Sequence, residues 1–257
     1  MKPLTSAPRE DMAQIRFVLT DMDETLTYRG RLSAAAYTAL ERLQAAGVVV
    51  IPVTAAPAGW CDQMVRMWPV DAVIGENGGL LLQRRGEDVH RSFWSDQPEE
   101  DRRRLEDLAA RIRGDTPGAI LADDQPFRLA TLAFRSSDDP ELRSRVLEGL
   151  RAGGARTTEN NLWLLGWLGA FDKLAMTRRA LAELYGLDVD DARDQVLYVG
   201  DSVNDAPMFE FFRHTVGVRT VRRYLSQLPA APAWITEGPG GSGFVETADA
   251  VLAARSR

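Results

Sequence analysis

The alternation of short apolar runs with amphipathic segments constrains this chain most. Residues 15–20, 48–53 and 195–200 are mainly apolar runs of strand length, and polar residues follow each of them. Runs without polar alternation predict strands buried on both faces, and strands that alternate with helices predict parallel βαβ units. The sequence therefore predicts an α/β fold, a Rossmann-like parallel sheet with helices on both faces.

Local signals predict where several of these elements begin and end. Ser33 is the expected N-cap of a helix that Gly47 stops, and a second helix is expected at 59–67, before a third strand at 71–75. After residue 171 the same rhythm resumes, with helices at 172–186 and 246–255, a strand at 215–218 and a loop at 237–243.

The middle of the chain follows a different pattern. It predicts a hairpin around Gly86, a charged helix at 98–113, an alternating strand at 128–135, a helix at 139–154 and a final strand at 161–168. This composition is typical of a small α+β domain. We expect a core domain at 1–82 and 168–257, interrupted by an inserted domain at 83–167.

Composition excludes several classes of protein. The single cysteine, Cys61, cannot form an internal disulfide, and with only His90 and His214 no cysteine/histidine zinc site can assemble. A net charge of -6 argues against a nucleic-acid partner. No apolar run is long enough to cross a membrane and the first residues lack a secretory apolar region, so we expect a cytoplasmic protein without a membrane partner. The sequence leaves the oligomeric state open.

Polar side chains cluster where the predicted parallel strands end. Since these strand ends meet at one edge of the sheet, we expect the clusters to lie together. Carboxylates suit Mg²⁺, and several of them in one place repel each other unless a cation is present. An aspartate can also attack phosphorus, while a second carboxyl group protonates the leaving oxygen. The residues concerned are Asp21, Asp23, Thr54, Asp201, Asn204 and Asp205.

These residues carry a family resemblance. DMDETLT at 21–27, Thr54, Lys173 and GDSVNDAPMF at 200–209 resemble, in order and spacing, the four motifs of haloacid dehalogenase-like (HAD) phosphohydrolases. The resemblance implies that Asp21 is the nucleophile and that Asp23 is the general acid/base. It also implies a Mg²⁺ site formed by Asp21, the backbone carbonyl of Asp23, and Asp201.

The resemblance implies further roles and a place for the insert. Phosphoryl binding falls to Thr54, to the backbone N–H of Ala55 and to Lys173, and Asn204 and Asp205 support the site. The insert at 83–167 lies between the second and third motifs, as in the class with a C2 cap. Together with ENGG before it, this looks like subfamily IIB, which includes sugar-phosphate phosphatases and phosphomannomutases.

The second motif departs from the family pattern. Many relatives have Thr-Gly-Arg-Pro there, whereas this chain has Thr54-Ala55-Ala56-Pro57. Thr54 can still donate its hydroxyl proton and Ala55 its N–H, but the arginine's contacts to substrate or cap are missing.

The expected function is a Mg²⁺-dependent phosphatase acting on a small phosphorylated metabolite, a sugar phosphate or a phosphorylated sugar derivative, through an aspartyl-phosphate. A sugar-phosphate phosphomutase remains an alternative, and the missing arginine keeps open a non-catalytic sugar-phosphate sensor. Dehalogenase and phosphonatase chemistry is disfavoured because neither needs the acid/base at Asp23. Trp163, Trp167 and Phe171 favour packing over stacking on a sugar.

Overall fold

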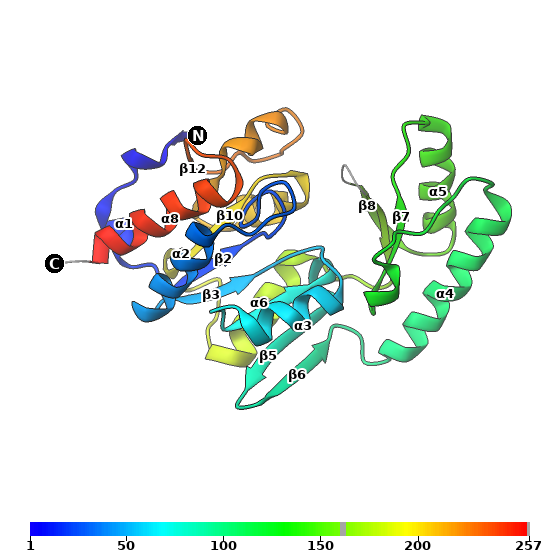
Figure 1. Cartoon of the computed structure of the whole chain (residues 1–257), viewed down its shortest axis with the longest axis horizontal. Coiled ribbons are helices and arrows are strands. Elements are labelled where there is room, and N and C mark those ends of the chain that lie inside the picture. The colour runs from blue at the N-terminus through cyan, green and yellow to red at the C-terminus, as the bar shows by residue number, and fades with distance from the viewer. Residues whose placement is uncertain (160–162, 256–257) are drawn as a thin grey trace.

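A six-stranded parallel sheet forms the centre of the larger part of the molecule (Figure 1). The computed structural model describes residues 1–159 and 163–255. The strand order is β1-β12-β11-β10-β2-β3, and neighbouring strands run parallel. The strands are β1 (Lys2–Pro3), β2 (Phe17–Thr20), β3 (Val49–Pro52), β10 (Val196–Gly200), β11 (His214–Gly217) and β12 (Trp234–Ile235).

Two hydrophobic layers sandwich this sheet, because successive residues of a strand point to opposite faces. Val18, Val50 and Val199 face one layer, and Phe17 and Ile51 face the other. The first layer includes α2 (Ala34–Ala45), α3 (Ala58–Met67) and α8 (Gly240–Arg255), and the second includes α6 (Lys173–Tyr185) and α7 (Ala206–Phe211). A short α1 (Arg9–Ala13) packs on α8. The predicted Rossmann-like fold is confirmed.

A three-stranded antiparallel unit continues beyond β3. It consists of β4 (Ala72–Gly75), β5 (Leu80–Arg85) and β6 (Asp88–Phe93), and a parallel bridge from Val53 to Ile74 joins it to the large sheet. The predicted hairpin turns at Gly86, whose φ is +64°. The hairpin β5–β6 contacts α3, and β5 also contacts α6, so it lies against the core helices.

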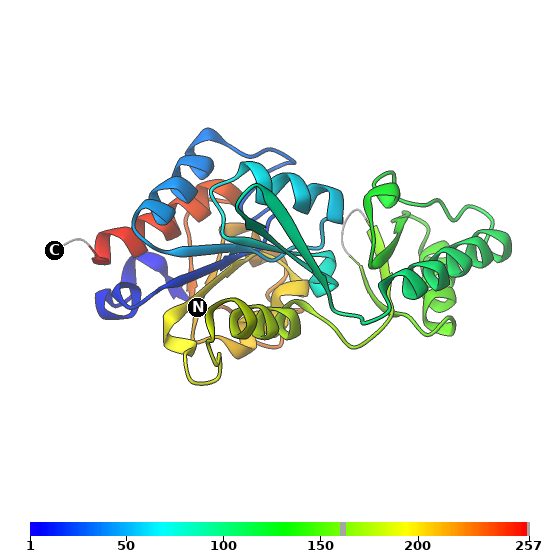
Figure 2. The same cartoon turned by 90° about the horizontal axis from the view of Figure 1, so that it is seen from below.

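The rest of the insert forms an antiparallel α+β layer at one end of the molecule (Figures 1 and 2). Its sheet has the order β7-β9-β8, with β7 (Thr131–Arg135), β8 (Arg156–Glu159) and β9 (Trp163–Trp167). Apolar residues of α4 (Pro98–Asp115) and α5 (Pro140–Ala152) pack on this sheet. We call residues 98–167 the cap. The predicted inserted α+β section is confirmed, while the boundaries at 83 and 167 stay a prediction.

Several local predictions are accurate and some are wrong. Ser33 caps α2 by accepting from the N–H of Ala36 at 3.1 Å. The loop predicted at 237–243 is confirmed at 237–239 but wrong at 240–243, because α8 begins at Gly240. A Cβ on Gly241 would lie 2.8 Å from the carbonyl oxygen of Leu26, so the glycines allow close packing there. The pattern missed β1, β8, β12 and α1. Residues 161 and 162 of the predicted strand at 161–168 lie outside the described residues.

Within the described residues, no helix has the length and apolar character that a membrane crossing requires.

Candidate active site

The candidate site lies at the carboxyl ends of three neighbouring parallel strands. The N–H of Asp21 donates to the carbonyl of Val199 at 2.8 Å, so this residue continues the pairing of β2 with β10. Asp201 directly follows β10, and Thr54 lies two residues beyond β3. Because β2 lies between β10 and β3, three of the four predicted motifs meet at one edge of the sheet.

Lys173 brings the third motif to this edge. It is the first residue of α6, whose N-cap Asp172 accepts from the N–H of Ala175. Its buried Nζ donates to Asp21 Oδ1 at 2.8 Å and to Asp205 Oδ1 at 2.7 Å. Burial disfavours the charged ammonium, but the carboxylates of Asp205 and Asp21 more than offset this and raise the pKa of Lys173. The two carboxylates therefore favour the charged form of this side chain inside the site.

Three buried carboxylates surround this one ammonium. Asp21, Asp201 and Asp205 each offer an oxygen atom, and these atoms lie within 4.8 Å of one another. Burial, together with the charge of Asp205, raises the pKa of Asp21 to about 7 against the opposing effect of Lys173. Burial and the charges of Asp21 and Asp205 raise the pKa of Asp201 to about 9. The cluster thus holds more carboxyl groups than Lys173 alone can neutralise, and without a cation burial and mutual repulsion favour the protonated forms of Asp21 and Asp201.

Asp205 differs from the other two carboxylates because protein donors occupy both of its oxygens. Oδ1 accepts from Lys173 and from the hydroxyl of Tyr198, and Oδ2 accepts from the N–H groups of Asp201 and Ser202, at 2.9 and 3.1 Å. A carboxylate has about four acceptor positions, so this one is saturated. Asp205 therefore holds the fourth-motif loop and Lys173 in place.

The donor set fits a hard divalent cation. Asp21 uses Oδ1 for Lys173, and Asp201 uses Oδ1 to accept from the hydroxyl of Thr25 at 3.3 Å. Within the described residues, the Oδ2 atoms of Asp21 and Asp201 accept no hydrogen bond. Mg²⁺ takes a small number of protein oxygens and completes its shell with water or phosphate. Asp21 and Asp201, with a nearby backbone carbonyl, could hold such an ion.

Asp23 lies beside this cluster but outside the group of three carboxylates. Part of the Asp23 residue is open to solvent, but protein atoms lie closely around its carboxyl group. The resulting desolvation raises the pKa of Asp23 to about 6, and Lys173 acts in the opposite direction. A carboxyl group with such a pKa can both donate and accept a proton near neutral pH.

The second-motif loop is anchored mainly through its backbone. The N–H of Thr54 donates to the carbonyl of Ile74, and the carbonyl of Thr54 accepts from the N–H of Asn77. The N–H of Ala56 donates to Thr54 Oγ1 at 3.0 Å. Ala56 is buried where the family pattern has arginine. A guanidinium nevertheless reaches this loop, because Arg128 of the cap donates to the carbonyl of Ala55 at 3.1 Å.

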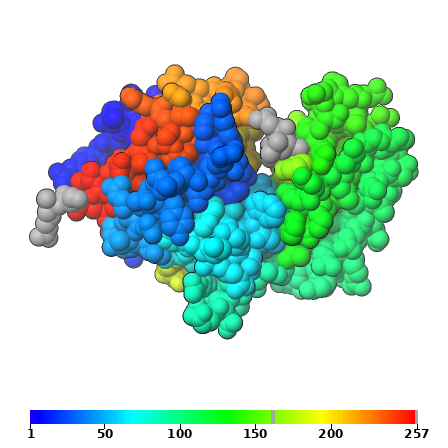
Figure 3. Space-filling view, in the orientation of Figure 1, coloured from blue at the N-terminus to red at the C-terminus, as the bar shows by residue number. Residues whose placement is uncertain are grey.

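The fourth-motif loop also borders a cleft between cap and core. Asn204, which accepts from the hydroxyl of Ser202 at 2.7 Å, lies on its core side and not in the carboxylate cluster. The cap–core cleft has a volume of about 640 Å³. Figure 3 shows the cap and the core separated on one side of their junction. Lining residues are Ser136, Ser137, Asp138, Arg143, Thr158 and Glu159 of the cap, and Ser202, Val203, Asn204, Tyr224 and Gln227 of the core.

Three residues near the site escaped the sequence prediction. The sequence offered one clue to Tyr198, because it is the one aromatic residue, and the one hydroxyl group, in the apolar run of β10. Glu76, in the short 3₁₀ turn Glu76–Gly78, is fully buried, and Arg128 is nearly so. Glu76 entered the sequence prediction only as part of ENGG, without a role, and the contact of Arg128 with Ala55 joins residues 73 apart in the sequence. The aromatic residues behave as packing groups: the rings of Trp167 and Phe171 stack at 5.8 Å.

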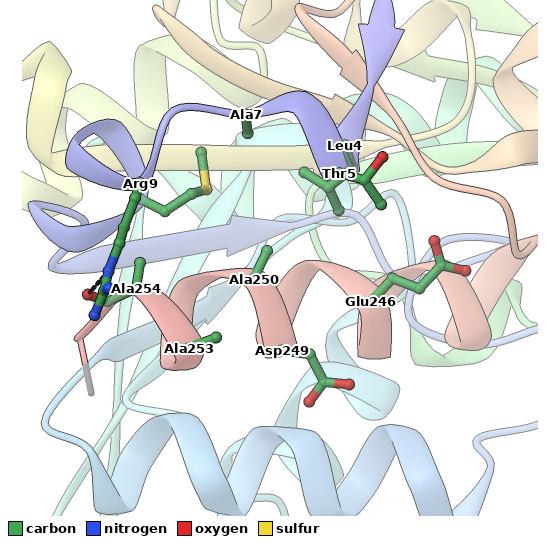
Figure 4. Close-up of a pocket in the computed structure, with 10 residues that line it drawn as sticks. Leu4, Thr5, Ala7, Arg9, Glu246, Asp249, Ala250, Ala253 and Ala254 are labelled. Atoms are coloured by element: carbon green, nitrogen blue, oxygen red, sulfur yellow. Dashed lines mark hydrogen bonds between the residues drawn. The ribbon is translucent and has the colours of Figure 1, made fainter. Parts of the chain in front are cut away.

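A second hollow lies on another part of the core. It has a volume of about 510 Å³ and lies between the N-terminal segment and α8 (Figure 4). Arg9 closes one end by donating to the carbonyl of Ala254 at 3.4 Å. None of the predicted site residues lines it.

Comparisons with known proteins support the fold. No protein-family model and no curated protein matches the sequence. Among solved structures, a Thermoplasma acidophilum protein superposes with a TM-score of 0.70 at 22% identity, covering 93% of this chain and 99% of its own. A haloacid dehalogenase-like hydrolase from Bacteroides thetaiotaomicron gives 0.70 at 17% identity, covering 91% and 98%.

A further similar structure is the sucrose-phosphatase of Synechocystis sp., solved in complex with sucrose and phosphate. Its TM-score is 0.67 at 15% identity, and the superposition covers 93% of this chain and 98% of that one. The chain therefore has the fold of haloacid dehalogenase-like hydrolases over nearly its whole length, as the sequence resemblance predicted.

Proposed function

We propose that this chain is a Mg²⁺-dependent phosphatase that hydrolyses a small phosphomonoester through an aspartyl-phosphate. The observation that carries the proposal is the convergence of Asp21, Lys173, Asp201 and Asp205 from separate segments into one buried, hydrogen-bonded cluster. A buried cluster with excess negative charge is costly unless it binds a cation. The similarity in fold to a sucrose-phosphatase also supports a phosphatase function.

In the first step, Asp21 is the nucleophile. One carboxylate oxygen of Asp21 attacks phosphorus, a new P–O bond forms, and the bond between phosphorus and the ester oxygen breaks. The leaving oxygen takes a proton from the carboxyl group of Asp23, whose pKa of about 6 leaves a protonated fraction near neutral pH. Lys173 and the hydroxyl of Thr54 neutralise and orient the phosphoryl oxygens.

In the second step, water attacks the aspartyl-phosphate. The carboxylate of Asp23 accepts the proton of the water, the bond from phosphorus to Asp21 breaks, and inorganic phosphate leaves. Asp21, Asp201 and the Asp23 carbonyl would hold a divalent cation, which would supply positive charge to offset the buried carboxylates and the phosphoryl group. Asp205 keeps Lys173 oriented, since it accepts from Nζ at 2.7 Å.

The cap–core cleft supports a polar organic group on the substrate. Hydroxyl, amide and charged side chains line it, among them Ser136, Arg143, Asn204 and Gln227, and it borders the fourth-motif loop. A polyhydroxylated group such as a sugar matches this lining better than an apolar group does. We therefore propose a sugar phosphate or a phosphorylated sugar derivative as the substrate.

The test is release of inorganic phosphate from a panel of sugar phosphates and a generic aryl phosphate, with Mg²⁺ and with a chelator. We expect Mg²⁺-dependent release by the wild type. Asp21→Asn should lower the rate about a thousandfold or more, because it removes the nucleophile. Asp107→Asn, at an exposed position on α4, is the matched control and should keep the wild-type rate.

Undiminished turnover by Asp21→Asn would refute the mechanism. Product analysis separates the nearest rival, since a phosphomutase converts one sugar phosphate into an isomer without net release of phosphate. A protein that binds sugar phosphates but hydrolyses neither them nor the aryl phosphate is a sensor, and that result would also reject the proposal.

A further inference from the structure

Arg128 is a buried arginine of the cap that reaches into the core. It follows the 3₁₀ turn Gln125–Phe127, and only 1% of its side chain is exposed. Nε and Nη2 donate to the two carboxylate oxygens of Asp124, at 3.0 and 2.8 Å. This paired geometry fixes the guanidinium plane and neutralises its charge within the cap.

The remaining guanidinium nitrogen connects the cap to the second motif. Nη1 donates to the carbonyl oxygen of Ala55 at 3.1 Å and to the hydroxyl of Thr131 at 3.1 Å. Arg128 and Ala55 are 73 residues apart in the sequence. This contact joins the cap directly to the loop that follows β3.

The carbonyl of Ala55 and the N–H of Ala56 belong to one planar peptide group. A bond that fixes the carbonyl therefore also fixes the direction of the N–H, which donates to Thr54 Oγ1 at 3.0 Å. Because Thr54 Oγ1 accepts here, its own proton remains for donation to another group. Hydrogen bonds in such a chain also polarise one another.

Glu76 also connects the cap segment 128–131 to the core, through hydrogen bonds of its carboxylate. Its carboxylate is fully buried and accepts from the N–H of Leu129 at 2.8 Å, the N–H of Ala130 at 2.9 Å and the hydroxyl of Thr131 at 2.6 Å. It also accepts from the N–H of Ala58, at the start of α3, at 3.0 Å. Residues 128–131 of the cap therefore sit at a fixed place beside the second-motif loop.

We propose that Arg128 is a positioning residue for phosphoryl binding, acting through the Ala55–Ala56 peptide on the hydroxyl of Thr54. This inference rests on the proposed function, because that function assigns the Thr54 hydroxyl to the phosphoryl group. Through Arg128, the position of the cap would influence the geometry of the second motif, although Arg128 itself contacts only the backbone of that loop.

The test combines substitutions at the two ends of the hydrogen-bond chain. Arg128→Gln and Thr54→Val are made singly and together, and kcat, KM and the Kd for inorganic phosphate are measured with Mg²⁺. We expect each single variant to lower kcat/KM about tenfold, with the larger part in kcat. The double variant should be no worse than Thr54→Val alone, because both substitutions interrupt one chain.

Two further variants separate positioning from structure. Arg128→Lys keeps the charge but cannot bind Asp124 and Ala55 together, so it should recover less than half of the lost activity. Arg135→Gln, on the exposed face of β7, should leave all three parameters unchanged. The melting temperature of every variant is measured in parallel.

Wild-type kinetics in the Gln and Lys variants would overturn the inference, and so would additive losses in the double variant, which indicate independent effects. If neither Arg128 variant folds, the residue is structural and the inference also fails. A wild type that neither releases phosphate nor binds it would instead reject the proposed function, and the inference with it.

Discussion

Two buried clusters of charged side chains differ in how far protein donors satisfy their carboxylates. At the strand ends, Asp21, Asp201 and Asp205 lie together, and the ammonium of Lys173 pairs with Asp21 and Asp205. At the cap joint, defined as Glu76, Asp124 and Arg128, the guanidinium is paired with one carboxylate, and the other carboxylate accepts four hydrogen bonds. At the first centre, Asp21 and Asp201 each accept one side-chain hydrogen bond, whereas at the second the unpaired carboxylate of Glu76 is satisfied by four protein donors.

The difference teaches how to separate a binding site from a structural joint. Buried carboxylates that protein donors satisfy hold segments together, and they require nothing from solution. Buried carboxylates in excess repel each other, which raises their pKa values, and an added cation allows them to stay charged. Asp205 shows both roles side by side, since it belongs to the charged cluster yet is saturated like Glu76. Three predictions test this contrast.

The largest effect is expected at the cap joint. Glu76→Gln replaces one acceptor oxygen by an NH₂ group that faces N–H donors, so it should lower the free energy of unfolding by about 3 kcal/mol. Urea denaturation measures this. Glu210→Gln, at an exposed position of α7, is the control and should change stability by less than about 0.5 kcal/mol. Equal stabilities of the two variants would show that the joint contributes nothing.

A smaller effect is expected from metal at the strand ends. Mg²⁺ at a hundredfold excess over its Kd should stabilise the wild type by about 2.7 kcal/mol, seen as a rise in melting temperature. Asp201→Asn should lose most of this rise. Without metal, Asp201→Asn should be about 1 kcal/mol more stable than the wild type, because the raised pKa of Asp201 makes folding protonate this carboxyl group, and the amide removes that cost.

Asp205→Asn is the matched comparison for that variant. It should destabilise the protein without metal, because its NH₂ group would face the N–H donors of Asp201 and Ser202. Opposite signs for the two variants support the distinction between ligand and scaffold. Losses of equal size would show that both carboxylates are structural.

The smallest effect is expected from His214, a buried group that belongs to neither centre. Burial lowers its pKa, with Asp11 and Asp194 acting in the opposite direction and Arg213 in the same one. The unfolded chain therefore binds this proton more tightly, so stability should fall as the pH drops through the ordinary histidine pKa of about 6.5.

His214→Phe keeps a ring to stack on Trp234, which lies at 5.7 Å, and it removes the titration. From pH 7 to pH 5 the wild type should lose up to about 1 kcal/mol more of its unfolding free energy than this variant. Urea denaturation at pH 7, 6 and 5 measures the difference. Parallel pH profiles would show that His214 does not titrate in this range.

The sequence supported most of the element order and predicted Asp21, Lys173, Asp201 and Asp205, which the structure brings together at the strand ends, but it did not predict Tyr198. Apolar runs such as 15–20 and 195–200 predicted buried strands, because strand burial and hydrophobic period are local properties of the chain. The part of the predicted loop 237–243 that spans 240–243 is wrong. The glycines in this part serve close packing of α8 against Leu26 and Thr236, and local patterns carry no information about such contacts.

The sequence by itself determined the α/β class, the interruption by a second unit, and the candidate residues Asp21, Asp23, Thr54, Lys173 and Asp201, because periodicity and spaced motifs are written along the chain. Tertiary structure alone decided that Asp205 is saturated and that Arg128 reaches the second motif from the cap. The reason is that hydrogen-bond saturation and charge balance depend on partners that only folding brings within 3 Å or so of each other.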